Sequence, residues 1–362
     1  MMGKYSLENY CSYRTYTIRP GAYAKAPSNR GRGMASFLEF SWRELEPSRG
    51  CYKISGMLEK LSSVNNPVLM IDPKAPVWLE AAQEECFVHL LRRIGSLLER
   101  QCNVIGIMLS PAIDNTTICD AYLEAFDRIP VMVSLTDARH IRYLKEKEHK
   151  FGLVVDCHEG NWIECCEYLA QYRLQSLWER MPVILRLSDS EPGPHICREM
   201  LRWHAGMANQ PLEVGYHLIL RRLTFPQKIS GNGALPIRFW FVNAGSAPCY
   251  QEFRLKLRLR HEGVCYEFSL GMNGSVCRIG DFTHNELIHL PELQEGSYAM
   301  AAGIFFMDGT PLNINIQAEQ KDGYYELGTV EVDNHMEDSL LHAWEGFYPE
   351  GYYPLEDPGT PV

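Results

Sequence analysis

The pattern of hydrophobic positions changes character near residue 212. Before that point, short apolar runs alternate with longer amphipathic runs. The short runs are rich in β-branched residues and lack period-two alternation, which is typical of strands buried on both faces of a parallel sheet. They are Met34–Trp42, Pro67–Ile71, Asn103–Leu109, Pro130–Leu135, Phe151–Asp156 and Pro182–Leu187.

The amphipathic runs predict helices between these strands. Cys86–Gln101 is the clearest, because its leucine, isoleucine and phenylalanine residues recur at helical spacing. Strand–helix repetition predicts a parallel α/β architecture. With a further strand at Tyr13–Ile18 the count approaches eight, so we predict a TIM-type (β/α) barrel over residues 1–212. The short stretch between Trp203 and Gly215 leaves little room for an eighth unit and predicts an irregular barrel. A doubly wound sheet is the alternative.

After Pro211 the strand-like runs are separated by Gly, Asn, Pro and Asp, and polar residues alternate with apolar ones. Residues 254–260, Arg-Leu-Lys-Leu-Arg-Leu-Arg, alternate strictly, with one apolar and one cationic face. Such alternation is typical of antiparallel sheets with one face in water. We therefore predict an all-β antiparallel sandwich over residues 213–332, followed by an acidic, aromatic tail at 333–362.

Composition and charge narrow the possible partners. The chain has 362 residues, 35 Lys and Arg against 45 Asp and Glu, and a net charge of −10. That balance argues against nucleic acid, because it offers no excess of cations to replace the counterions of phosphates. It does not favour an anionic membrane surface either, and it fits a neutral partner such as a sugar. It leaves the oligomeric state open.

Targeting and cysteine patterns predict a cytoplasmic protein. The first ten residues hold no apolar stretch of the kind found in secretion signals. No apolar run approaches the 18 residues that a membrane span requires. None of the twelve cysteines forms a Cys-x-x-Cys pair, so we predict no zinc site and buried thiols in a reducing compartment. No Gly-x-Gly-x-x-Gly follows an early strand, which gives a dinucleotide site no support, and we predict no cofactor.

Two segments carry a resemblance to a known family. Residues 40–52, Phe-Ser-Trp-Arg-Glu-Leu-Glu-Pro-Ser-Arg-Gly-Cys-Tyr, resemble the Trp-x-x-Leu-Glu-Pro-x-x-Gly-x-Tyr run after the second strand of barrel glycoside hydrolases of the β-galactosidase type, which are clan A-like. Residues 68–79 are similar to their third strand and its Pro-x-Trp. Residues 215–218 and 241–250 resemble a β-sandwich domain of unknown function that follows such barrels in bacterial proteins.

The resemblance implies two catalytic carboxylates at strand ends. In that family a glutamate ending strand four is the general acid/base and a glutamate ending strand seven is the nucleophile. At the end of strand four this chain departs from the pattern, since no glutamate stands there and the nearest carboxylate after Leu109 is Asp114. At the end of strand seven, Glu191 follows Leu187 and is the counterpart of the family's nucleophile. The resemblance therefore implies Asp114 and Glu191 as the catalytic pair.

Further polar and aromatic residues follow the predicted strand ends, where barrel active sites are built. Asp72 follows the third strand, and Asp156, His158 and Glu159 end the sixth. These four side chains are candidates for binding sugar hydroxyls. Trp78 and Trp162 lie just past strand ends, where a flat ring suits the face of a pyranose; the alternative for both is packing beneath loops.

Three hypotheses follow. The first is a glycoside hydrolase-like protein that uses Glu191 and Asp114. The second is a non-catalytic carbohydrate-binding or interaction protein on the same barrel and sandwich, since the strand-four glutamate is missing. The third is a metal-dependent hydrolase that uses Asp156, His158 and Glu159, although their spacing is not diagnostic of a metal site.

Overall fold

The structure is a computed structural model in which the chain divides into two compact units. The α/β unit comprises residues 28–216 and the segment Gly245–Tyr250, and the two-sheet unit comprises the rest. The structure describes residues 13–17, 34–79, 83–98, 104–272, 277–307, 309–316, 318 and 320–335. Most of the predicted tail, from residue 336 onward, lies outside the described residues.

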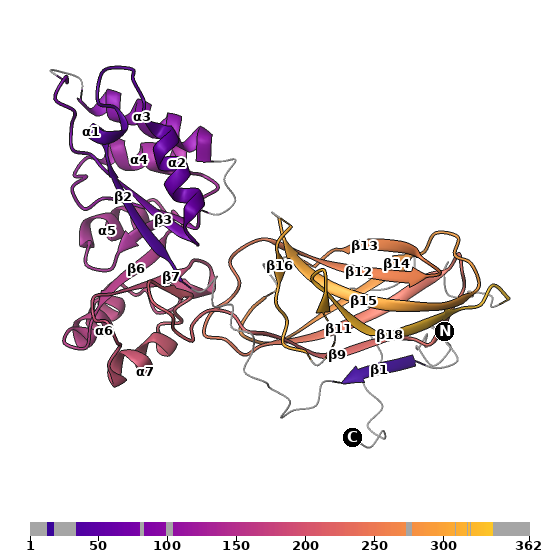
Figure 1. Cartoon of the computed structure of the whole chain (residues 1–362). Helices are drawn as coiled ribbons and strands as arrows, with labels where there is room; N and C mark the ends of the chain where they lie inside the picture. Colours follow the sequence, from indigo (N-terminus) through magenta and orange to yellow (C-terminus); the bar gives the residue numbers. More distant parts are fainter. Residues whose placement is uncertain are drawn as a thin grey trace, which may run out of the picture. The chain divides into compact units, whose positions relative to one another are not determined.

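Parallel strands alternate with helices in the α/β unit, as the hydrophobic runs predict (Figure 1). The sheet has the order β2-β3-β4-β5-β6-β7-β8. Its strands are β2 (Ser36–Ser41), β3 (Pro67–Asp72), β4 (Gly106–Met108), β5 (Val131–Ser134), β6 (Gly152–Cys157), β7 (Val183–Leu187) and β8 (Met207–Ala208). The helices are α1 (Trp42–Leu45), α2 (Ile54–Ser63), α3 (Gln83–Leu98), α4 (Thr116–Ala125), α5 (Ala138–Glu146), α6 (Trp162–Gln171), the 3-10 turn η2 (Leu177–Glu179) and α7 (Pro194–Arg202).

The predicted TIM-type barrel is wrong. The described part of the unit has seven parallel strands in a curled sheet, not eight. The segment expected to supply a barrel strand, β1 (Tyr13–Thr17), instead pairs antiparallel with a strand of the other unit. At the other end, β8 is two residues long, and a single bridge joins its Ala208 to Met34. The chain between α7 and the second unit is too short for a full strand and helix.

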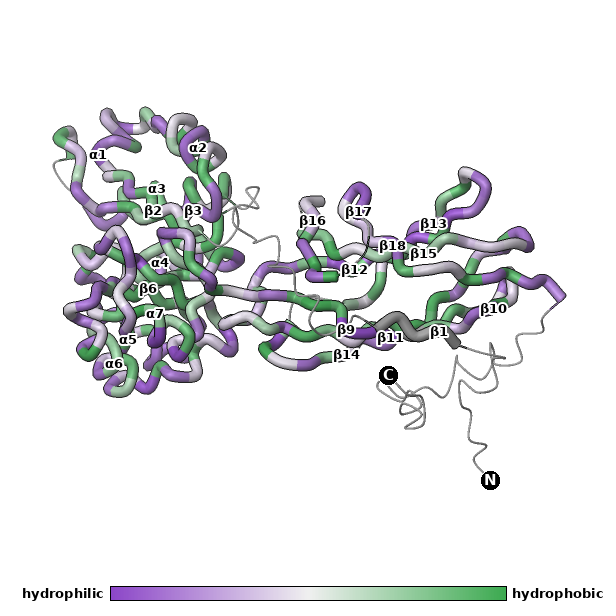
Figure 2. The backbone as a smooth tube through the Cα atoms, turned by 60° about the horizontal axis from the view of Figure 1, so that its bottom comes forward, coloured by the Kyte–Doolittle hydropathy of each residue, from purple (hydrophilic) through white to green (hydrophobic). Residues whose placement is uncertain are grey.

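The curled sheet buries side chains on both faces, which is why its strands read as continuous apolar runs. The outer face packs against the helices in a large cluster that includes Trp42, Phe87 and Tyr122. The inner face holds a smaller apolar cluster around Met132 and Val154. In Figure 2 the tube around β6 is correspondingly hydrophobic.

Two glycines make room for the inner cluster. A Cβ added to Gly106 would lie 2.5 Å from Cγ of Met132, and one added to Gly152 would lie 2.3 Å from its Sδ. The fully buried Met132 side chain therefore occupies the space that side chains on β4 and β6 would need. Two residues beyond Met132 and Val154, the same faces of β5 and β6 carry the polar residues Ser134 and Asp156.

The two-sheet unit contains mostly antiparallel strands. One sheet has the order β1-β9-β11-β14, and the other β10-β18-β15-β12-β13 with β16 and β17 at its side. Besides β1, the strands are β9 (Leu218–Pro226), β10 (Lys228–Ile229), β11 (Ala234–Asn243), β12 (Phe253–His261), β13 (Val264–Leu270), β14 (Gly280–His289), β15 (Gly296–Phe306), β16 (Pro311–Leu312), β17 (Gln320–Lys321) and β18 (Tyr324–Val332). The sandwich arrangement of these sheets stays a prediction.

The cationic face of β12 meets a carboxylate on the neighbouring strand. Glu267 of β13 accepts hydrogen bonds from Lys256 at 2.8 Å and Arg258 at 3.0 Å, and from the Tyr324 hydroxyl at 2.8 Å. The Arg258 guanidinium also lies over the Tyr324 ring, 3.5 Å from its centroid. Two of the four cationic side chains of this face, Lys256 and Arg258, therefore share one carboxylate within their own sheet.

The loop Gly245–Tyr250 belongs to the α/β unit, although it connects two strands of the other unit. The Ser246 hydroxyl donates to the carbonyl of Ala205 at 2.7 Å and accepts from the Gly215 N–H at 2.8 Å. The Tyr250 hydroxyl donates to the carbonyl of Trp178 at 2.5 Å. The Ala-Pro-x-Tyr part of the sandwich-like motif thus fastens this loop to the α/β unit.

Candidate functional site

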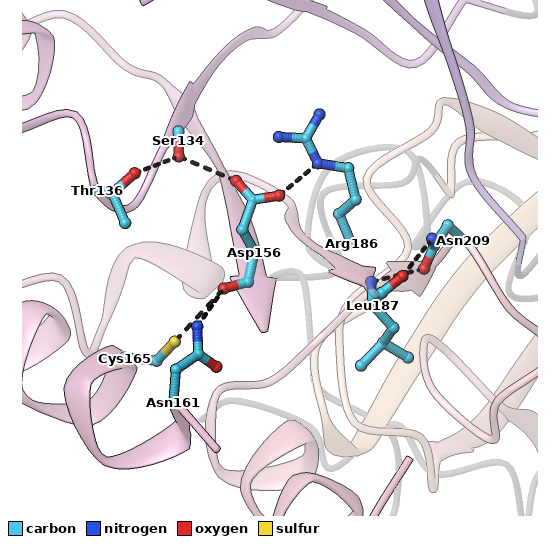
Figure 3. A network of polar contacts seen from close by, with 8 residues as sticks. All are labelled: Ser134, Thr136, Asp156, Asn161, Cys165, Arg186, Leu187 and Asn209. Carbon is cyan, nitrogen blue, oxygen red and sulfur yellow. Dashed lines mark hydrogen bonds and ion pairs between the residues drawn. The ribbon is translucent and has the colours of Figure 1, made fainter. Parts of the chain in front are cut away.

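Three strand ends bring polar side chains together at one edge of the curled sheet (Figure 3). Asp156 of β6 lies opposite Arg186 of β7 in the strand register, and its carboxylate forms an ion pair with Arg186 Nε. The Ser134 hydroxyl at the end of β5 donates to the same carboxylate at 3.2 Å, and lies 3.0 Å from the Thr136 hydroxyl. We call Ser134, Thr136, Asp156 and Arg186 the strand-end network.

Arg186 has donors left over for a ligand. Its two terminal nitrogens point away from Asp156 in Figure 3, and neither has a hydrogen-bond partner among the described residues. The guanidinium lies 5.2 Å from the centroid of the Phe37 ring, which steadies its plane. Both charged side chains are about one third exposed, at 35% for Arg186 and 34% for Asp156. The Asp156–Arg186 pair within the network therefore carries no net charge and is accessible to solvent.

A second group of polar side chains follows β6 directly. The Glu159 carboxylate contacts Nδ1 of His195 and accepts the N–H groups of His195 and Ile196, both at 3.3 Å, at the start of α7. The His195 ring stacks on Trp162 at 4.9 Å with an interplanar angle of 5°. Burial by itself raises the pKa of Glu159, but these hydrogen bonds lower it more. Glu159 is thus a capping carboxylate that orients His195.

The other residues expected to bind sugar beside the strands have local partners. Asp72, at the end of β3, accepts the N–H of Lys74 at 3.2 Å. His158 is exposed, and its Nδ1 accepts the Gly160 N–H at 3.1 Å. Asp156 is in the strand-end network. The three residues Asp156, His158 and Glu159, which were predicted to act together, therefore each contact a different partner.

The Trp78 side chain contacts the turn that contains the hydrolase-like motif. Its indole N–H donates to the carbonyl of Glu46 at 2.8 Å. The Glu46 side chain is buried and accepts the indole N–H of Trp42 at 3.0 Å and the N–H of Gly50 at 2.9 Å. These contacts favour the packing interpretation of Trp78 and show that the motif's Trp and Glu hold the turn after β2.

The two residues expected to catalyse hydrolysis lie in exposed loops. Asp114 precedes α4, and Glu191 lies between β7 and α7. Neither has a hydrogen bond or ion pair with another described residue. Their pairing across the sheet edge stays a prediction.

A metal centre receives no support from the described residues. Among them, no three His, Cys, Asp or Glu side chains converge in a way that could hold a metal ion. A cavity of about 380 Å³ lies between the ends of α5 and α6, lined by residues such as Arg142, Lys145 and Tyr172. None of the predicted site residues lines it.

Sequence reasoning missed several members of the site. Arg186 stands in an apolar strand, where only the register with β6 reveals its partner. The partner of His195, Glu159, is 36 positions away along the chain, so sequence spacing could not bring the two together. The amide of Asn209 bonds the N–H and the carbonyl of Leu187, and so extends the edge beyond the short β8. A polar residue two positions after a buried inward-facing one was the available signal for Ser134, Asp156 and Arg186.

Within the described residues, no helix combines the length and hydrophobicity needed to cross a membrane. No protein-family model and no curated protein matches the chain.

Comparison with solved structures finds weak structural similarity to glycosidases. Endo-glycoceramidase II from Rhodococcus sp. matches with a TM-score of 0.35 and 10% identity, over 74% of this chain and 96% of that one. The β-glucosidase from Listeria innocua matches with a TM-score of 0.24 and 8% identity, over 88% and 48%. The CARDB domain of a Pyrococcus furiosus protein matches 34% of this chain and 95% of its own, with a TM-score of 0.21 and 15% identity. Similarity at this level assigns no function.

Proposed function

We propose that this protein binds a neutral carbohydrate at the strand-end network and does not cleave it. The observation that carries the proposal is the Asp156–Arg186 pair, held by Ser134 at the solvent-exposed edge of a parallel sheet. Ligands of parallel α/β sheets bind at the carboxyl ends of the strands.

The chemistry of the network suits sugar hydroxyls. Each hydroxyl both donates and accepts, and the network offers carboxylate oxygens beside guanidinium N–H donors. Because the two charges cancel, the network has little preference for a charged ligand.

Two features favour binding over hydrolysis. A glycosidase needs one carboxyl that is protonated at working pH and a second that is ionised. At the end of β6, Asp156 is paired with Arg186, and the lowered pKa of Glu159 keeps that carboxyl ionised. Asp114 and Glu191 lack the neighbours that set such roles in the described part of the chain.

The test is calorimetric titration of the full chain with a panel of neutral sugars that includes glucose, galactose, cellobiose and lactose. We expect binding to one class of sugar, weakened about 10-fold or more by Asp156→Asn or Arg186→Met, because each removes hydrogen bonds to a charged group. Glu124→Gln and Arg92→Met remove an exposed ion pair on α3 and α4 and are the matched controls. They leave binding unchanged.

The hydrolase hypothesis is tested with nitrophenyl glycosides of the same sugars. Release of nitrophenol that Glu191→Gln abolishes would establish hydrolysis and refute the proposal of binding alone. Binding to none of the sugars, or binding that Asp156→Asn and Arg186→Met leave unchanged, would remove the strand-end network as the site.

A further inference from the structure

The strand β13 (Val264–Leu270) forms an open edge of the two-sheet unit. It is the last strand in the order β10-β18-β15-β12-β13, and among the described strands it pairs only with β12. Edge strands are commonly protected from other chains by lysine, proline or a very short length. The sequence of β13, Val-Cys-Tyr-Glu-Phe-Ser-Leu, is seven residues long and contains neither lysine nor proline.

The edge of the other sheet differs in this respect. Its last strand, β14, carries Asp281, Glu286 and two histidines along its ten residues. The one charged side chain of β13, Glu267, is instead held by Lys256 and Arg258 of its own sheet. Of these two edges, β13 is therefore the one that lacks protection by charge.

The hairpin between β12 and β13 fixes which backbone groups face the open edge. Glu262 and Gly263 form its two-residue turn, with φ values of 47° and 85°, as in a type I′ turn. Such a turn hydrogen-bonds the N–H of Val264 back to β12, and hydrogen-bonded and open positions alternate along an antiparallel ladder. Every second residue from Cys265 onward therefore points its N–H and C=O groups away from β12.

A contact just beyond the strand agrees with this alternation. The N–H of Gly271 is the next but one after Ser269 and donates to Oε2 of Glu286 at 2.8 Å, away from β12. The outward positions within β13 are Cys265, Glu267 and Ser269. No described residue hydrogen-bonds to their N–H or C=O groups. These three positions are thus available to a further strand.

The apolar side chains of β13 are only partly covered. Tyr266 and Phe268 lie opposite leucines of β12 that are fully buried, so they share the face that packs into the core. Both are nevertheless half-buried, and Val264 on the same face is 53% exposed. A strand added beside β13 would cover these side chains as well as bond the open backbone groups.

We propose that β13 pairs antiparallel with β13 of a second copy of this chain. Across a twofold axis the same strand faces itself, and outward residues must face outward residues. Of the registers that meet this condition, the one centred on Glu267 pairs all seven residues. It places Cys265 opposite Ser269 of the second copy and Tyr266 opposite Phe268. Such aromatic cross-strand pairs stabilise a sheet.

The charges at the centre of this ladder suit a second copy. The two Glu267 carboxylates face each other, which by itself is unfavourable. Each one lies beside its own Lys256 at 2.8 Å and Arg258 at 3.0 Å, so every carboxylate brings two cations. The surrounding positive charge offsets the repulsion. The ladder also ends before Gly271, so the contact with Glu286 remains in place.

Sedimentation velocity of the full chain over a roughly 100-fold range of concentration tests the pairing, because a dimer grows with concentration. Ser269→Pro removes an outward N–H that β12 does not use, and edge strands tolerate proline at such positions. We expect it to raise the dissociation constant of the dimer at least about 10-fold, because symmetry removes two hydrogen bonds. Ser269→Ala keeps the N–H and is the matched control that leaves the dimer unchanged.

A second variant tests the register without removing a hydrogen bond. Ser269→Cys places a thiol opposite Cys265 of the second copy, at a Cα separation of about 5.5 Å that a disulfide can span. Within one chain the two positions are about 13 Å apart, which no disulfide spans. We expect mild oxidation to link position 265 of one copy to position 269 of the other, identified by peptide mass spectrometry.

Three results would overturn the proposal. The first is a chain that stays monomeric over the whole range, which would leave the edge to a strand of another protein. The second is a dimer that Ser269→Pro does not weaken. The third is a disulfide between the two Cys265 residues in the oxidised natural chain, which the register keeps about 13 Å apart. The sugar titrations test residues of the α/β unit, so the two proposals stand or fall separately.

Discussion

The surroundings of two helical glycines, Gly95 and Gly56, predict that substitution by alanine has opposite effects on stability. A Cβ added to Gly95 of α3 would lie 2.0 Å from the carbonyl oxygen of Ala125, at the end of α4, and 2.9 Å from its carbonyl carbon. A Cβ added to Gly56 of α2 meets nothing within 4 Å. Gly95→Ala therefore changes the packing of two helices, whereas Gly56→Ala changes only the backbone.

The magnitude follows from the contact. Alanine improves helix stability by up to about 1 kcal/mol over glycine, and Gly56→Ala should show this gain. At Gly95 the two backbones must separate by about 1.4 Å before the contact becomes an ordinary one, because no flexible side chain can yield. Overpacking of this kind costs about 1–3 kcal/mol, and the alanine gain offsets up to about 1 kcal/mol of that cost. Because the obstacle is backbone, we expect the upper part of this range, a net loss of about 1–2 kcal/mol for Gly95→Ala.

Urea unfolding followed by tryptophan fluorescence measures this difference. Five of the seven tryptophans belong to the α/β unit, namely Trp42, Trp78, Trp162, Trp178 and Trp203. The signal therefore follows the unit that holds both glycines. If Gly95→Ala is as stable as the natural chain, or is stabilised like Gly56→Ala, the close approach of α3 and α4 is wrong.

Two further predictions concern polar contacts. Tyr250→Phe leaves the carbonyl of Trp178 without its hydroxyl donor and should destabilise the α/β unit by about 1–2 kcal/mol in the same urea assay; an unchanged midpoint would contradict the anchored loop. Hydrogen bonds from Lys256, Tyr324 and Arg258 outweigh burial and lower the pKa of Glu267 to about 2. Its stabilisation is therefore present above about pH 4.5 and is lost as the pH falls toward 2. Since Glu267 is 35% exposed, Glu267→Gln should cost only about 1 kcal/mol at pH 7 and less at pH 3 in thermal unfolding, whereas an equal cost at both would refute the shift.

Strands with a strong apolar pattern were predictable, and polar ones were not. Every apolar run predicted as a strand before residue 212 overlaps an observed strand. By contrast, the many polar residues of β14 (Gly280–His289) give no strong apolar pattern, and this strand depends on a full antiparallel pairing with β11. Propensity describes a residue's own preference, whereas pairing depends on a partner that is distant in the sequence.

The candidate site, too, was predictable only where local sequence carries the signal. Asp156 and Glu159 were predicted as site residues because they follow a buried strand, and the structure places both at the sheet edge. The sequence could not show that Arg186 neutralises the first, or that Glu159 caps α7 and orients His195. Both contacts join residues that are 30 or more positions apart in the sequence, and the register of β6 and β7 creates the first of them.

Local sequence by itself determined the alternation of parallel strands and helices before residue 212 and the turn-rich strands after it, because burial on one or two faces leaves a period in the hydrophobic positions. Only the tertiary structure decided that β1 joins the second unit, that the parallel sheet has seven strands, and that the loop Gly245–Tyr250 packs on the first. The physical reason is that a hydrophobic period records how much of a residue is buried, and not which part of the chain buries it.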